Sequence, residues 1–190
     1  ADIDSMTGII ESVLTYTRVE MNVEKPRKLS LGSLIDSIVA DYQDTGRDVT
    51  FRAGSDIVVQ SARSVFSARQ GQSVFAADRD VTVIGRPVSL ERAVTNLIEN
   101  ALKYGRRAIV ALEADAHTAR IIIEDEGSDS SAEDMAALMA PFQRGTNTAT
   151  IDGYGLGLTI VAAIAKLHGG SLSFEDTSNG LAACLVIDRA

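Results

Sequence analysis

The segment LERAVTNLIENALKY, residues 90–104, carries the most informative pattern in the chain. Asn96, Asn100 and Lys103 lie four and three residues apart, so an α-helix would place all three on one stripe. The opposite side of that helix carries the apolar residues Leu90, Ala93, Val94, Leu97, Ala101 and, in part, Leu102. We therefore predict a helix that buries its apolar side and presents two amides and one ammonium group.

The polar stripe has two interpretations. A solvated face is the ordinary outcome for an amphipathic helix. Such a face usually consists of Glu, Lys and Arg, because Asn is a poor helix former, so two Asn residues in mid-helix suggest a functional role. Amide oxygens are hard ligands suited to Mg²⁺, and a lysine ammonium is suited to phosphate. The stripe therefore indicates one wall of a magnesium–nucleotide site.

Composition narrows the class of protein. The chain has 190 residues, which is enough for one domain with a core and an appendage. Its net charge of −8, from 18 basic and 26 acidic residues, argues against a nucleic-acid surface, which needs clustered Lys and Arg. The single cysteine, Cys184, lies in an apolar run, so we expect it to be buried. The chain has no apolar stretch of about 18 residues, and no signal peptide opens it.

Residues 2–22 have the apolar spacing of one helix, with Ile3, Met6, Ile10 and Val13 among the positions on its seam. That seam needs a partner helix, which would come from a missing segment or from a second copy of the chain. The alternative is a helix that packs on the domain that follows. Because the chain starts without Met and directly in a helical pattern, we expect it to be a fragment of a larger protein.

After a connector at residues 24–28, apolar spacing predicts further helices over residues 29–42, 133–139 and 156–167, and Ser89 is the expected N-cap of the amide-bearing helix. Strands are expected at residues 49–51, 57–59, 81–84, 108–112, 120–123, 171–174 and 182–187. Residues 61–80 follow no clear pattern, although residues 64–66 and 73–75 have the spacing of a hairpin. Helices that alternate with strands, together with hairpin turns at residues 114–118 and 179–180, predict an α/β fold with a mixed sheet.

The segment IIIEDEG, residues 121–127, is a predicted buried strand that ends in an acid followed by a glycine. The Asp125 carboxylate at such a strand end can accept a hydrogen bond from an exocyclic amine such as adenine N6. Gly127 allows the backbone to approach a base closely. By itself this pattern is weak, because many strands end in a similar turn.

Two more segments follow. In GYGLG, residues 153–157, glycines allow backbone N–H groups to surround an anion, and the helix start at Leu158 adds the positive end of a dipole. In PFQRG, residues 141–145, Phe142 is suited to anchoring a loop, and Arg144 is either a phosphate contact or an exposed charge. The polar segment 128–152 is interpreted as a lid over the nucleotide.

In this order and at this spacing, the four segments resemble the N, G1, F and G2 boxes of the ATP-binding catalytic domain of two-component sensor histidine kinases. The resemblance runs from about residue 28 to the end, and residues 2–22 resemble the second helix of the dimerisation and phosphoacceptor hairpin. It implies the Bergerat ATP-binding fold, a two-layer α/β sandwich in which helices cover one face of a mixed sheet. The implied domains are a partial dimerisation helix, residues 1–24, and a catalytic domain, residues 25–190.

The resemblance also implies roles for individual residues. Asn100 would be the Mg²⁺ ligand, Lys103 a phosphate contact and Asp125 the reader of adenine N6, while Asn96 replaces the glutamate of related hydrolytic ATPases. Asn96, Asn100 and Lys103 would form the catalytic set. The ATP-binding residues implied are Asn96, Asn100, Lys103, Tyr104, Asp125, Gly127, Phe142, Arg144, Gly153, Tyr154, Gly155, Leu156, Gly157 and Leu158.

The sequence departs from the family pattern at two points. Asp129 stands where the G1 box usually has a second glycine. Neither histidine resembles a phosphoacceptor, since His117 lies in a predicted turn and His168 at a helix end, where we expect a structural role. The implied partners are therefore the phosphoacceptor helix of a homodimeric parent protein and a response regulator. The expected location is cytoplasmic, including the cytoplasmic portion of a membrane-bound sensor.

Two other functions remain open on the sequence. A degenerate regulatory module that binds nucleotide weakly or not at all is the main alternative to a kinase, and Asp129 is the feature that favours it. A hydrolytic ATPase or serine kinase of the same superfamily is the other, and Asn96 argues against it, because an amide cannot deprotonate water.

Overall fold

The structure is a computed structural model and describes residues 24–52, 76–77, 81–127, 131–137 and 157–189. Several predicted features lie outside these residues: the helix at 2–22, the strand at 57–59, the hairpin at 64–75, Asp129, the segment 141–145 with Phe142 and Arg144, and most of the glycine segment, namely Gly153, Tyr154, Gly155 and Leu156.

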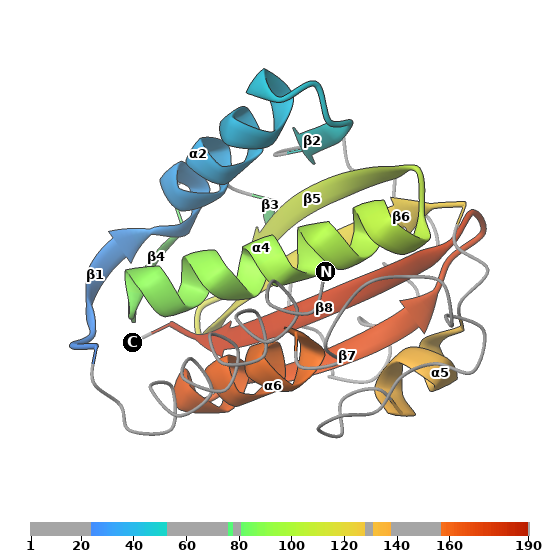
Figure 1. Cartoon of the computed structure of the whole chain (residues 1–190). Helices are drawn as coiled ribbons and strands as arrows, with labels where there is room; N and C mark the ends of the chain where they lie inside the picture. The colour runs from blue at the N-terminus through green and yellow to red at the C-terminus, as the bar shows by residue number, and fades with distance from the viewer. Residues whose placement is uncertain (1–23, 53–75, 78–80, 128–130, 138–156, 190) are drawn as a thin grey trace, which may run out of the picture.

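The described residues form one large mixed sheet and one small two-stranded sheet (Figure 1). The large sheet contains β2 (Val49–Arg52), β5 (Arg107–Ala114), β6 (Thr118–Glu126), β8 (Leu181–Asp188) and β7 (Ser171–Asp176) in this order, and β3 (Ala76–Ala77) also pairs with β5. The β2–β5 pair is parallel and the other pairs are antiparallel. The prediction of a mixed sheet is therefore confirmed.

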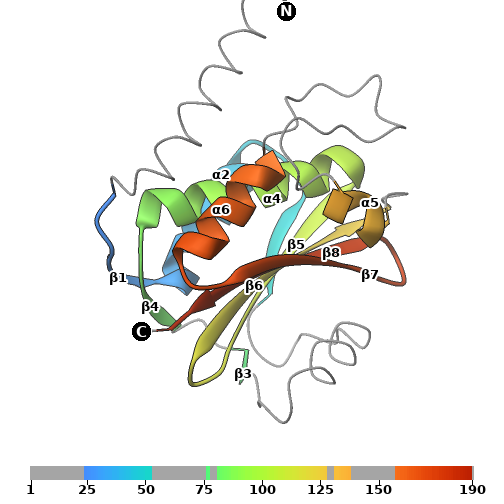
Figure 2. The same ribbon diagram turned by 90° about the horizontal axis from the view of Figure 1, so that it is seen from below.

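Helices lie on one face of the large sheet, as Figure 2 shows for α4 and α6. The helices are α2 (Leu31–Asp44), α4 (Pro87–Tyr104), α5 (Ala132–Ala137) and α6 (Gly157–Leu167). Strand alternation divides the sheet residues between two apolar clusters: Val110 and Leu112 pack with the helices, whereas Ala111 lies in a second cluster with Cys184. The main core therefore lies between the helices and the sheet, as the two-layer prediction requires.

Helix α4 buries the side that its sequence predicts. Its buried residues are Leu90, Ala93, Val94, Leu97, Ile98 and Ala101. Helix α6 is apolar around most of its surface, and Val161 and Ile164 are completely buried, because α6 packs against both α4 and the sheet. These two helices therefore hold the Asn-bearing stripe of α4 close to the start of α6.

The prediction of a helix over residues 29–42 was wrong at its start. A strand, β1 (Arg27–Ser30), comes first and pairs antiparallel with β4 (Thr82–Gly85), so that Leu29 lies opposite Val83. Helix α2 then begins at Leu31, and the Ser30 hydroxyl caps it by accepting a hydrogen bond from the Ser33 N–H at 3.3 Å. Leu29 continues the helical spacing because it packs against the same core from the strand.

The predicted N-cap of α4 was also wrong. The helix begins at Pro87, and the residue at the N-cap position is Arg86, whose side chain makes no capping bond. The cap comes instead from the Glu24 carboxylate, which accepts hydrogen bonds from the N–H groups of Val88 at 2.8 Å and Ser89 at 3.0 Å. The Ser89 hydroxyl donates to the same carboxylate at 2.8 Å. A sequence motif could not reveal this cap, because the acceptor is remote in sequence.

The other predicted ends are close to those observed. Gly46, with φ of 76°, follows the end of α2, and Gly169, with φ of 73°, follows the end of α6. At the start of α5, the Ser131 hydroxyl accepts a hydrogen bond from the Asp134 N–H at 3.1 Å and donates to the Asp134 carboxylate at 2.8 Å. This capping box agrees with the predicted short helix, which the structure gives as Ala132–Ala137.

Cys184 is completely buried on β8, as its apolar surroundings in the sequence predict. Burial raises the pKa of its thiol to about 12, so the group is an uncharged apolar filler rather than a nucleophile. Among the described residues, no helix is long and apolar enough to cross a membrane.

Candidate nucleotide-binding site

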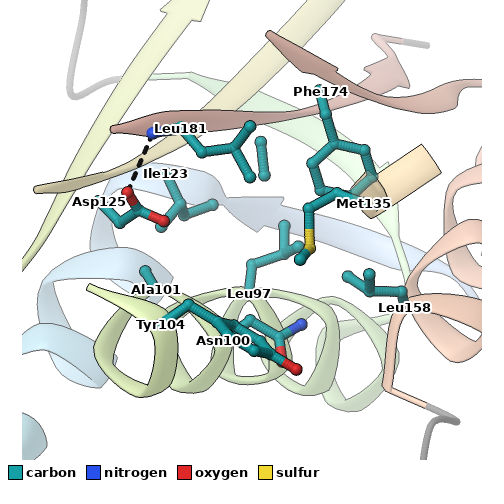
Figure 3. A pocket seen from close by; sticks show the side chains of 11 residues that line it. Leu97, Asn100, Ala101, Tyr104, Ile123, Asp125, Met135, Leu158, Phe174 and Leu181 are labelled. Carbon is teal, nitrogen blue, oxygen red and sulfur yellow. Dashed lines mark hydrogen bonds between the residues drawn. The ribbon is translucent and has the colours of Figure 1, made fainter. Parts of the chain in front are cut away.

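A hollow that is open to solvent lies between α4 and the sheet (Figure 3). The hollow is lined by Leu97, Asn100, Ala101, Tyr104, Ile123, Asp125, Met135, Leu158, Phe174, Leu181 and Ala183. Mostly apolar walls with a few polar groups are typical of a site that binds an organic ring.

Asp125 is the acidic residue of this hollow. It lies next to the last residue of β6 and is 4% exposed. Its Oδ1 atom accepts a hydrogen bond from the Leu181 N–H at 2.9 Å (Figure 3). Two residues later Gly127 turns the chain with φ of 88°, and its N–H donates to the Asn179 carbonyl at 2.8 Å. The predicted acid at a strand end is thus held against the β7–β8 turn, inside the hollow.

Of the three polar residues of the α4 stripe, Asn100 lines the hollow, whereas Asn96 and Lys103 do not. Asn100 lines the hollow together with Tyr104, one turn further along the helix. Lys103 does not line it, and its ammonium lies 5.5 Å from the centre of the Tyr104 ring. Burial raises the pKa of the Tyr104 phenol, which is therefore neutral near pH 7. The structure thus brings Asn100, Tyr104 and Asp125 together, with Lys103 at the side.

Asn96 lies one turn before Asn100 and faces the start of α6. A Cβ atom built on Gly157 would lie 3.9 Å from the Asn96 amide. The Asn96 Nδ2 atom is buried and has no hydrogen-bond partner among the residues that the structure describes. A buried donor in that state costs about 1–3 kcal/mol, so it marks a place where a polar ligand would fit.

Helix α6 begins at Gly157, beside Asn96, and Leu158 lines the hollow with 7% of its surface exposed. The first N–H groups of a helix have no partner within it and carry partial positive charge, which favours an anion nearby. Gly157 is the residue of the predicted glycine cradle that lies within the described chain. Its place agrees with a phosphate-binding role next to the Asn stripe.

Sequence reasoning missed the apolar floor of the hollow. Met135 of α5, Phe174 of β7 and Leu181 of β8 line it with Ile123 (Figure 3). From the sequence, each of these residues is an apolar position of a helix or strand that would be expected in an ordinary core. The sequence carries no local signal that separates a side chain facing a hollow from one packed in a core.

His168 lies at the end of α6 and is 8% exposed. Its Nδ1 lies 2.8 Å from the Ile164 carbonyl, and its Nε2 accepts a hydrogen bond from the Arg86 N–H at 3.0 Å, so the ring is the neutral Nδ1–H tautomer. Burial lowers its pKa. These bonds agree with the structural role expected for it. His117 lies in the exposed turn between β5 and β6.

Residues 85–188 match the family described as histidine kinase-, DNA gyrase B- and HSP90-like ATPases. The chain is 32% identical over 156 residues to the signal transduction histidine-protein kinase/phosphatase MprB of Mycolicibacterium vanbaalenii, an alignment that covers 77% of this chain and 32% of MprB. It is 29% identical over 192 aligned positions to the sensor protein KdpD of Mycobacterium tuberculosis, covering 99% of this chain and 20% of KdpD. The chain thus spans a small part of these curated relatives.

The crystal structure of the ATP binding domain of PrrB from Mycobacterium tuberculosis has the same fold, with a TM-score of 0.62 and 21% identity over 88% of this chain and 99% of that domain. The family match covers more than half of the chain and contains α4, β6 and α6, from which the polar groups of the hollow come. The chain belongs to the histidine kinase-, DNA gyrase B- and HSP90-like ATPase family, and within it to the ATP-binding catalytic domains of sensor histidine kinases.

Proposed function

We propose that this chain binds Mg²⁺–ATP in the hollow between α4 and the sheet and transfers the γ-phosphoryl group to a histidine on another segment of its parent protein. The observation that carries the proposal is the placement of Asp125 and Asn100. One is a buried carboxylate and the other an amide, and both line one largely apolar hollow that is open to solvent.

The adenine ring would occupy the apolar part of the hollow, between the α4 side and the floor formed by Met135 and Phe174. The Asp125 carboxylate would accept a hydrogen bond from the exocyclic N6 amine. A hydrogen bond to a charged group contributes about 1.5–3 kcal/mol in a buried setting. Asp125 is buried, so this bond would distinguish adenine from a purine without that amine.

The triphosphate would extend from the hollow toward Asn96 and the start of α6. The N–H groups at Gly157 and the Lys103 ammonium would attract the phosphates. The Asn100 amide oxygen is the expected Mg²⁺ ligand, and hard oxygen donors are what this ion prefers. Mg²⁺ would neutralise charge on the phosphate oxygens and hold them in position. The buried Nδ2 atom of Asn96 is a donor in the right place for a polar group of this ligand.

Asn96 favours phosphoryl transfer over hydrolysis. An amide is not a base, so it cannot remove a proton from an attacking water molecule. Slow hydrolysis would preserve the γ-phosphoryl group for a proper acceptor. Catalysis would then consist of positioning the nucleotide and balancing its charge. The alternative is a degenerate regulatory module without kinase activity, which would bind nucleotide weakly or not at all, and a magnesium-dependent ATP titration separates the two.

The acceptor histidine would lie on a helix of the parent, next to residues 1–24, which would belong to the dimerisation hairpin, while residues 25–190 form the catalytic domain. The parent would be a homodimer that passes its phosphoryl group to a response regulator. We propose a cytoplasmic location, because the chain would find ATP and its response regulator in the cytoplasm. The names of the matched relatives, a histidine-protein kinase/phosphatase and a sensor protein, support a kinase as the parent protein.

Two substitutions test the binding site. Asp125→Asn should lower ATP affinity by about 10-fold or more, because a charged acceptor for N6 is lost. Asn100→Ala should remove the part of the affinity that depends on Mg²⁺. Calorimetric titration with ATP measures both, and circular dichroism checks the fold. Asp44→Asn, on the exposed end of α2, is the matched control and should bind as the wild type does. Unchanged ATP affinity in both site variants would refute the site.

A further inference from the structure

We infer that the β7–β8 turn at Asn179–Gly180 positions Asp125, so that Gly180 and the Leu181 N–H set the preference of the site for a base with an exocyclic amine. The inference rests on the proposed function, because it assumes that a nucleotide base enters the hollow. It gives a role in base selection to a turn that is far in sequence from α4 and Asp125.

Two hydrogen bonds hold the end of β6 to this turn. The Leu181 N–H donates to Asp125 Oδ1 at 2.9 Å, and the Gly127 N–H donates to the Asn179 carbonyl at 2.8 Å. The regular pairing of β6 with β8 ends at Glu124 and Ala182. Beyond that pair, a backbone N–H of β8 is directed to a side chain instead of to a strand neighbour. The turn therefore fixes one oxygen of the carboxylate that faces the hollow.

Position 180 requires glycine because the backbone there lies too close to Asp125 for a side chain to fit. A Cβ atom at this position would lie 2.3 Å from Asp125 Oδ1 and 2.5 Å from the Asp125 carbonyl oxygen. Gly180 does not have the left-handed backbone that makes glycine necessary at Gly127 and Gly169. A larger residue at position 180 would therefore displace Asp125, whatever the backbone conformation of the turn. Asn-Gly is also a common hairpin turn, but that preference alone does not explain a contact with a buried carboxylate.

A fixed carboxylate matters for selectivity because a hydrogen bond weakens steeply when donor and acceptor are misaligned. The hydrogen bond from the Leu181 N–H restricts the rotation of the Asp125 side chain, and the absence of a Cβ atom at Gly180 leaves room for the carboxylate in that orientation. The carboxylate is thus oriented before the base arrives, which lowers the entropy cost of recognition. Loss of the restraint should weaken the bond to N6 and leave the contacts of the ring with the apolar walls.

The test compares Leu181→Pro with Leu181→Ala in the full chain. Both variants lose the leucine side chain that lines the hollow, but Leu181→Pro also loses the N–H that holds Asp125. Leu181 is the first residue of β8, a position at which proline is tolerated. Each variant is titrated with ATP and with the triphosphate of purine riboside, which lacks the exocyclic amine. The ratio of the two affinities reports on the bond from N6 to Asp125.

The wild type should prefer ATP over the purine riboside triphosphate by about 10-fold or more. Leu181→Ala should weaken both nucleotides by a similar factor and keep the ratio. Leu181→Pro should lower the ratio by about 3-fold or more, since the carboxylate is no longer held. Equal ratios in the two variants would overturn the inference. A wild type that binds neither nucleotide, or binds both equally, would instead contradict the proposed function.

Gly180→Ala supplies an independent variant in case the proline variant does not fold. Its control is Gly85→Ala, which places a Cβ atom 2.8 Å from the Leu90 Cδ1 atom, outside the hollow. Both substitutions should lower the melting temperature, but Gly180→Ala alone should reduce the ratio of the two nucleotide affinities. The same ratio in Gly180→Ala and in the wild type would show that the turn is only structural.

Discussion

Asp125 and Asn100 face the hollow from two different elements, β6 and α4 (Figure 3). The carboxylate is buried and accepts a hydrogen bond from the backbone of a neighbouring turn, whereas the amide lies on a helix near Lys103, and both of these residues are partly exposed. At the scale of single residues, the proposed function therefore assigns recognition of the base to Asp125 and recognition of the phosphates, through Mg²⁺, to Asn100. Each can be tested by its own substitution.

The buried Asn96 Nδ2 atom, which has no hydrogen-bond partner among the described residues, should lower the stability of the protein without nucleotide. Asn96→Leu, a change of similar shape, should raise the free energy of unfolding without nucleotide by about 1 kcal/mol, because a buried donor without a partner in the described structure is removed. The same variant should lose most of its affinity for Mg²⁺–ATP. Denaturant unfolding and calorimetric titration measure the two effects.

Thr50→Val is the matched control for that prediction. The Thr50 hydroxyl on β2 is also buried without a hydrogen-bond partner in the described part of the chain, and Thr50 does not line the hollow. Its replacement should raise stability while nucleotide affinity stays the same. A loss of stability in Asn96→Leu would contradict the account, since it would mean that the amide is satisfied within the folded protein.

His168 should make stability depend on pH. The folded protein holds this residue neutral, and burial lowers its pKa below the ordinary value of 6.5. The contribution of neutral His168 to the free energy of unfolding is therefore complete above about pH 6.5. It is lost as pH falls through the lowered pKa, because the unfolded chain then binds a proton that the folded chain does not. Melting temperatures of wild type and His168→Gln, measured from about pH 8 to pH 5, should converge as pH falls.

His117→Gln is the control, because His117 lies in an exposed turn, and its melting curve should follow that of the wild type throughout. A constant difference between His168→Gln and the wild type over the whole pH range would show that the neutral ring and its bond to the Arg86 N–H contribute no pH dependence.

At the scale of elements, the N-terminal end of α4 is held in place by Glu24, a residue outside the helix. Its first turn is capped by Glu24, and the Arg86 guanidinium Nε donates to the Glu24 carbonyl at 2.7 Å. Burial alone would raise the pKa of Glu24, but the Val88 and Ser89 donors hold it below its ordinary value. The residues just after position 23 are thus tied to the helix that carries Asn96 and Asn100.

Glu24→Ala should therefore destabilise the protein by about 1 kcal/mol, the usual cost of a lost helix cap. The charged cap is present above about pH 4.5 and is lost as pH falls below that value, since the folded-state pKa is lowered. Urea unfolding near neutral pH and at about pH 3 measures the difference. Glu91→Ala, at an exposed position of the same helix, should have a smaller effect; an equal loss in both variants would rule out the capping role.

The sequence predicted those elements whose signals are local. Apolar spacing located α4 and its buried side, and glycines located the ends of α2 and α6. The errors occurred where a distant group replaces a local signal. Leu29 follows helical spacing but lies in β1, because it packs on the same core from a strand paired with β4. Ser89 is of a residue type that often caps helices, but its hydroxyl donates a hydrogen bond to the Glu24 carboxylate instead of accepting one from its own helix.

At the scale of the whole molecule, the site exists because the layers bring distant segments together. Helices α4 and α6 pack on one face of the sheet (Figure 2), and α5 lies against β7. Residues of α4, α5, α6, β6, β7 and β8 therefore line the hollow together. The polar members of the site, Asn100 and Asp125, were predictable from residue type and spacing. The apolar floor with Met135 and Phe174 was not, because its side chains become neighbours only when the layers are assembled.

The most direct test of the account is a calorimetric titration of the whole chain with a non-hydrolysable ATP analogue, with and without Mg²⁺. The account predicts one binding site per chain, with an affinity that rises by about 10-fold or more when Mg²⁺ is present, since the triphosphate then meets Asn100 through the ion. It also predicts that Asp125→Asn loses affinity under both conditions, while Asn100→Ala loses chiefly the part that depends on Mg²⁺. Absence of binding at millimolar analogue, with the chain folded by circular dichroism, would contradict the account.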